Sequence, residues 1–144
     1  MHIIMIFTKD NIEQISKTLG TEPKIETNSY VWNVPNPTNG QKIIVSLYND
    51  VDFKCCKGAL VSVQSVHGYF ELHNISNFLV FEPDELIFIR HEGDNISTLV
   101  VGREATCSLY SNISRDLLKQ DLTELEPPVL LSAMQVAIID SLLE

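Results

Sequence analysis

Short runs of apolar residues, several of them alternating with polar ones, fill the middle of the chain. The clearest is 59–65, where Val61 and Val63 are separated by polar side chains. Successive side chains of a strand point to opposite faces, so this alternation is typical of a half-buried β-strand. Similar runs predict further strands at 2–7, 24–34, 41–48, 78–81, 86–89, 96–101 and 105–110.

Turn-forming residues separate these runs. The sequence Pro35-Asn-Pro-Thr-Asn-Gly40 lies between 24–34 and 41–48 and predicts that the two strands form an antiparallel hairpin. Residues 49–52 include three polar side chains and predict the next turn, which can extend to Lys57 and Gly58. Around Gly68 the alternation shifts, which predicts a bulge or a sharp bend.

Helical spacing is found near both ends of the chain. At 10–19, Asp10 and Glu13 have the spacing of a capping box, and Gly20 stands where a helix commonly ends. Three apolar residues of this segment share one face: Ile12, Ile15 and Leu19. Two further helices are predicted at 115–120, after an N-cap at Ser114, and at 128–143.

These elements predict a single α+β domain over residues 1–144. We expect a mainly antiparallel, curled sheet of about six to eight strands. The N-terminal helix and the C-terminal helical pair would pack on it. A chain of this length buries enough surface to fold without metals or disulfides.

The final predicted helix is apolar on more than one face. Its two apolar stripes are Leu131, Met134, Ile138 and Leu142, and Val129, Val136, Ile139 and Leu143. A surface helix normally shows one apolar arc. The helix therefore either lies in a groove of its own domain, or packs one stripe there and the other against a second copy. A third alternative is that the second stripe receives a helix or strand of a different protein. We interpret the following residues as an interface: Leu131, Met134, Val136, Ile138, Ile139 and Leu142.

Charge excludes two classes of partner. The chain has 10 basic and 19 acidic residues, a net charge of −9, and no basic cluster. Nucleic acids and anionic membranes are therefore not expected partners, whereas a protein partner is compatible with this charge.

The three cysteines lack disulfide-framework spacing, the N-terminal run does not resemble a signal peptide, and no apolar run reaches about 20 residues. We expect a cytoplasmic protein.

One strand carries a candidate metal site. In a regular strand, His67, Glu71 and His73 would share a face, and two imidazoles with a carboxylate suit zinc or ferrous iron. The alternative is that these residues are the solvent face of a strand whose other side bears Phe70 and Leu72.

No other pattern predicts catalysis. Cys55 and Cys56 lie between two lysines that would lower a thiol pKa, but no histidine is placed beside them by the sequence.

No motif identifies a family, and no cofactor is predicted. The leading hypothesis is a non-enzymatic binding or adaptor module that forms a homodimer. The alternatives are a small metal- or ligand-binding β-rich protein, and a structural subunit of a larger assembly.

Overall fold

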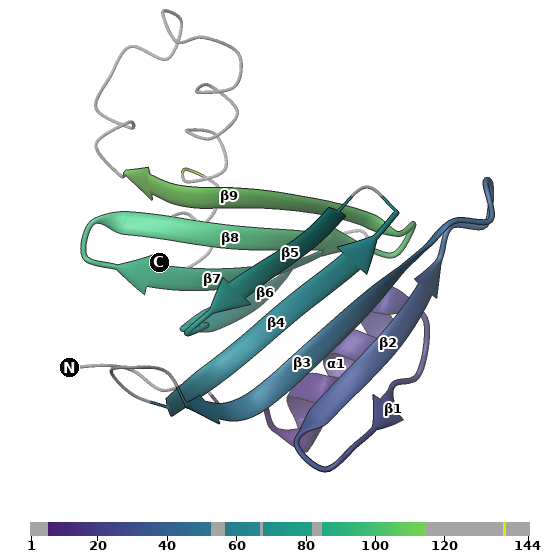
Figure 1. The fold of residues 1–144 in the computed structure, drawn as a ribbon, viewed down its shortest axis with the longest axis horizontal. Helices are drawn as coiled ribbons and strands as arrows, with labels where there is room; N and C mark the ends of the chain where they lie inside the picture. Colours follow the sequence, from purple (N-terminus) through teal and green to yellow (C-terminus); the bar gives the residue numbers. More distant parts are fainter. Residues whose placement is uncertain (1–5, 53–56, 67, 82–84, 115–136, 138–144) are drawn as a thin grey trace, which may run out of the picture.

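A computed structural model of the chain describes residues 6–52, 57–66, 68–81, 85–114 and 137. Within them the protein is mostly β, with 63% strand and a single helix of seven or more residues, so the predicted α+β class is wrong. The predicted C-terminal helical pair lies outside the described residues, apart from Ala137, which is helical. The strands also form two antiparallel sheets instead of one curled sheet (Figure 1).

The first sheet, sheet A, has five strands in the order β1-β2-β3-β4-β5. Their bounds are Lys24–Ile25, Ser29–Pro35, Lys42–Asp52, Lys57–Ser65 and Gly68–His73. The predicted hairpin is confirmed, because β2 pairs with β3 and Trp32 stands opposite Val45. The predicted turn at 49–52 is wrong: β3 continues to Asp52 through a register shift between Tyr48 and Val51. Asp50 has a φ of 62° at that shift, a left-handed conformation that acidic side chains tolerate.

The second sheet, sheet B, has four strands in the order β6-β7-β8-β9. Their bounds are Asn77–Phe81, Glu85–Glu92, Asn95–Gly102 and Thr106–Ser114. The four strands form a meander at the positions predicted from the sequence, 78–81, 86–89, 96–101 and 105–110, but β9 continues to Ser114. Each strand pairs with its neighbour in sequence, as the short connections require.

The helix α1 spans Lys9–Leu19 and confirms the predicted helix. Its cap differs from the prediction: Thr8 is the N-cap, and the reciprocal bond comes from Asn11 instead of the Asp10 and Glu13 pair. Gly20 ends the helix with a φ of 75°, as predicted. Residues 6–8, which precede it, are not a strand, and the rest of the predicted strand 2–7 lies outside the described residues.

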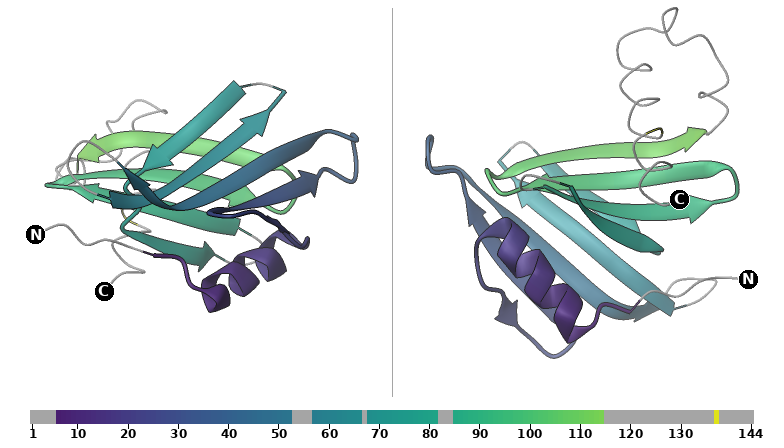
Figure 2. Two further views of the ribbon diagram at one scale, coloured as in Figure 1. Left: turned by 60° about the horizontal axis from the view of Figure 1, so that its bottom comes forward. Right: turned by 180° about the vertical axis from the view of Figure 1, so that it is seen from behind.

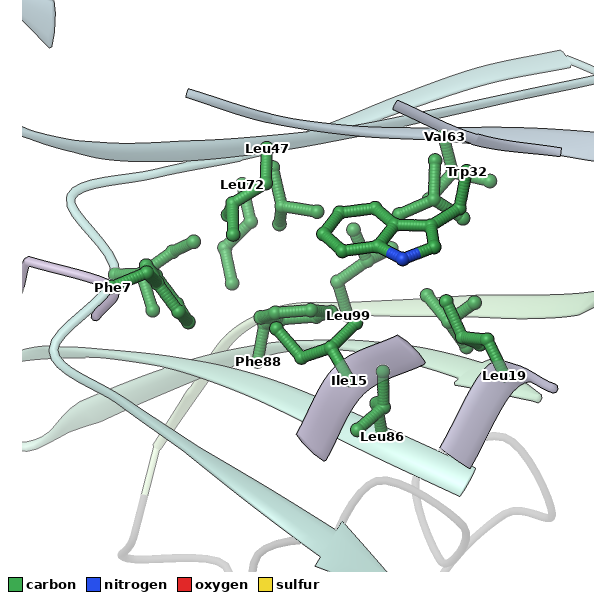
Figure 3. Close-up of a cluster of buried hydrophobic side chains, with 14 of the residues drawn as sticks. Phe7, Ile15, Leu19, Trp32, Leu47, Val63, Leu72, Leu86, Phe88 and Leu99 are labelled. Carbon is green, nitrogen blue, oxygen red and sulfur yellow. The ribbon is translucent and has the colours of Figure 1, made fainter. Parts of the chain in front are cut away.

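Sheet B and α1 lie on the same side of sheet A (Figure 2). The core is between these layers, where α1, sheet A and sheet B all contribute buried side chains (Figure 3). The buried Trp32 donates from Nε1 to Ser16 Oγ at 3.0 Å, so its one polar atom is satisfied inside the core. Arg103, after β8, donates to the backbone oxygens of Lys17 and Thr18 and joins sheet B to the end of α1.

Candidate interaction surfaces

Each sheet has an outer face that points away from the core. On sheet A this face carries the residues that alternate with Trp32, Val45 and Val63 along the central strands. They are Val31, Asn33, Ile44, Ser46, Tyr48, Leu60, Ser62, Gln64, Tyr69, Glu71 and His73. Tyr48 is 36% and Tyr69 57% exposed, while Ile44 and Leu60 are half-buried. The outer face of sheet A is therefore a mixed surface of aromatic, aliphatic and polar side chains, most of which are at least partly exposed.

The structure brings two of the three predicted metal ligands together on this face. His73 Nε2 lies 3.1 Å from Glu71 Oε2, since the two residues are two apart on β5. His67 lies outside the described residues, and among those that are described no three His, Cys, Asp or Glu residues gather closely enough to hold a metal. The Glu71–His73 contact is exposed, and an ion pair at such a position contributes little stability.

Of the three cysteines, the structure describes Cys107. Cys55 and Cys56 lie outside the described residues. Cys107 is a free thiol on β9, opposite Val101, where it packs against the core. Burial raises its pKa from 9.0 to about 11, so very little reactive thiolate is present at neutral pH.

The outer face of sheet B was missed by the sequence analysis as a distinct surface. It is formed by residues that alternate with Leu86, Phe88, Leu99 and Val101, which face the core. They include Leu79, Ile87, Ile89, Ile96, Thr98, Val100 and Ile113. Three of them, Ile87, Ile89 and Ile96, form a buried apolar cluster separate from the main core. The signal for this face was the unbroken apolar run 86–89, because a strand covered on both faces does not alternate.

The predicted interface residues of the final segment are not placed by the structure. All six of them, Leu131, Met134, Val136, Ile138, Ile139 and Leu142, lie outside the described residues. Their neighbour Ala137 is described, and it is helical and exposed. Among the described residues, no helix has the length and apolar character needed to cross a membrane.

Comparison of the sequence with models of protein families, with curated proteins and with solved structures gives no match.

Proposed function

We propose that the protein is a non-enzymatic protein-binding module of the cytoplasm. It acts as a homodimer, or within a larger assembly, through the segment 128–143. The observation that carries the proposal is the apolar circumference of this segment, which presents two stripes at helical spacing. One supporting surface covers about one arc of a helix, so the second stripe needs another partner. The helical conformation of Ala137 agrees with the spacing.

The energetics favour association. Burying four or five Leu, Ile, Val or Met side chains contributes roughly 1.5–3 kcal/mol for each. A symmetric pair buries the same stripe from both chains, which is enough to decide the assembly state. The net charge of −9 makes a basic protein surface the best-matched partner for the remaining surface.

Light scattering of the full chain at micromolar concentration tests the proposal. We expect a mass twice the 16.2 kDa of one chain. Met134→Asp and Ile138→Asp should each give monomeric or insoluble protein, because a carboxylate would have to be buried in the interface. Gln135→Asp is the matched control, since Gln135 belongs to the same segment but to neither stripe. A wild-type protein that is monomeric throughout this concentration range contradicts the proposal.

A second candidate function is binding of a divalent metal by His67, Glu71 and His73. The observation in its favour is the 3.1 Å contact that holds the Glu71 and His73 side chains together on one face of β5. Elemental analysis of protein purified without added metal tests this candidate. A stoichiometric metal that is lost in His73→Ala supports it, and metal-free protein whose melting is unchanged in chelator removes it.

A further inference from the structure

The outer face of sheet B is apolar and lacks charge at its centre. The pairing of β6, β7, β8 and β9 gives one row across the sheet that consists of Leu79, Ile87, Val100 and Ser108. The next row consists of Asn77, Ile89, Thr98 and Tyr110. Beyond it, Ile96 pairs with Ile113 on one side and with His91 on the other. The central strands β7 and β8 thus carry mainly apolar side chains on this face. An antiparallel sheet that has one solvated face normally carries polar side chains there, so this composition is that of a covered face.

The burial of these side chains indicates that a further layer lies on the face. Ile87, Ile89, Ile96 and Thr98 are 3%, 0%, 1% and 1% exposed. Neighbours within a sheet shield a side chain from the sides but leave its outer end open to water. On the outer face of sheet A, the large side chains of the central strands illustrate this, because Ile44 and Leu60 are half-buried and Tyr48 is 36% exposed, while the small Ser62 is 6% exposed. The described members of the Ile87–Ile89–Ile96 cluster all come from sheet B, and none comes from α1 or sheet A.

We propose that the C-terminal segment 128–143 of the same chain covers the outer face of sheet B. The chain leaves β9 at Ser114, the residue after Ile113, which itself packs against this face. Residues 115–127 follow and can span up to about 40 Å when extended. Four strands at about 4.8 Å spacing are about 15 Å across, so the segment can reach every strand of the sheet.

The dimensions of the two parts agree. As a helix, 128–143 would be about 24 Å long, and an eight-residue strand such as β7 is about 26 Å long. One apolar stripe of the segment would lie along the isoleucines of the face. This inference rests on the proposed function for the use of the other stripe, which stays available for a second copy.

Methyl NMR of the full chain tests the inference. The protein is deuterated and labelled at Ile, Leu, Val, Met and Ala methyl groups, and cross-peaks are collected between protons closer than about 5 Å. We expect cross-peaks from Ile89 and Ile96 to methyl groups of residues 128–143. The signals are identified by their loss in Ile89→Val and Ile96→Val, which are conservative core changes. Ile44, on the outer face of sheet A, is the matched control and should give no cross-peak to this segment.

Three results would overturn the inference. Cross-peaks from Ile89 and Ile96 to Ile3, Ile4 or Met5 would assign the face to the N-terminal residues. Cross-peaks found exclusively between differently labelled chains in a mixed sample would assign it to a second copy. Absence of any cross-peak to residues 128–143 would also reject it. Light scattering on the same sample separates the two proposals, because a monomer with intrachain cross-peaks keeps this inference and rejects the homodimer.

Discussion

The outer faces of the two sheets are built from similar strands but meet different surroundings. On sheet A, β4 alternates through 61–64, so that Val61 and Val63 face the core while Ser62 and Gln64 face outward. On sheet B, β7 has apolar side chains on both faces through 86–89, and all four are buried. Alternation along β4 accompanies an open face, and its absence along β7 accompanies a covered one. The sequence of a single strand thus reports how many layers enclose it.

This difference predicts different stability costs at the two faces. The outer face of sheet A exposes Tyr48 and Tyr69 among polar side chains. On the outer face of sheet B, Ile87, Ile89 and Ile96 are buried. Mutations on the outer face of sheet B should therefore cost more stability than mutations on the outer face of sheet A.

The largest expected effect comes from placing a carboxylate on each face. Ile89→Asp removes a fully buried isoleucine and buries a charge, and we expect a loss of about 4 kcal/mol or more in the free energy of unfolding. Ile44→Asp is matched in residue type and central strand position, but its side chain is half-buried. It should cost about 1–2 kcal/mol. Urea denaturation followed by circular dichroism measures both values.

Equal losses at the two positions would remove the contrast between the faces. If Ile89→Asp prevents folding altogether, Ile89→Ala provides the graded comparison. It should cost about 2–5 kcal/mol, more than Ile44→Ala, because a residual cavity forms where the surroundings cannot collapse.

Much of the strand content could be predicted from the sequence. The hairpin of β2 and β3, the meander of β6 to β9 and the helix α1 each follow from local signals: turn formers, alternation and 3.6-residue spacing. The division into two sheets could not be predicted. It depends on the connection at 74–76, where Ser76 N donates to Ile89 O and the chain passes from one sheet to the other. Nothing in the residues of that connection specifies which strands pair across it.

The candidate sites were less predictable for a different reason. Alternation placed Glu71 and His73 correctly on one face, but it gives no information on where a strand begins, which for β5 is Gly68. The capping box was predicted two residues too far along the chain, because Asp10 and Thr8 both suit an N-cap and the choice depends on where the preceding chain enters.

A smaller effect is expected from Thr98, the polar residue at the centre of the covered face. Its side chain is 1% exposed, and Oγ1 has no hydrogen-bond partner in the part of the chain that the structure describes. Replacing it by Val keeps the shape and removes a buried, unsatisfied hydroxyl. Thr98→Val should therefore stabilise the protein by about 1 kcal/mol, which corresponds to a rise of about 3 °C in Tm.

Thr98→Ser is the matched change, because it keeps the hydroxyl and removes the methyl group. It should lower stability by about 1 kcal/mol if the methyl group is packed. Thermal melting of both variants decides the point. A destabilised Thr98→Val would mean that the hydroxyl is hydrogen-bonded and that the covering layer is polar at this position.

The smallest expected effect is a pH dependence from Cys107, on the core-facing side of the edge strand β9. Burial raises the thiol pKa from 9.0 to about 11, so the folded protein keeps this proton in a range where the unfolded chain loses it. Stability falls with rising pH wherever the folded state binds more protons, which for this thiol is the window from about pH 9 to about pH 11. The wild type should therefore lose stability across that window more steeply than Cys107→Ala.

Urea titrations at pH 8, 9 and 10 measure this difference, and the other titrating groups are common to both proteins. Cys107→Ala lowers stability at every pH by removing packing, so the relevant quantity is the change with pH and not the offset. Parallel curves would mean that water reaches the thiol. In that case solvent enters the core beside the edge strand β9. Sheet B would then pack on the rest of the core mainly through β7 and β8, where Phe88 and Leu99 are fully buried.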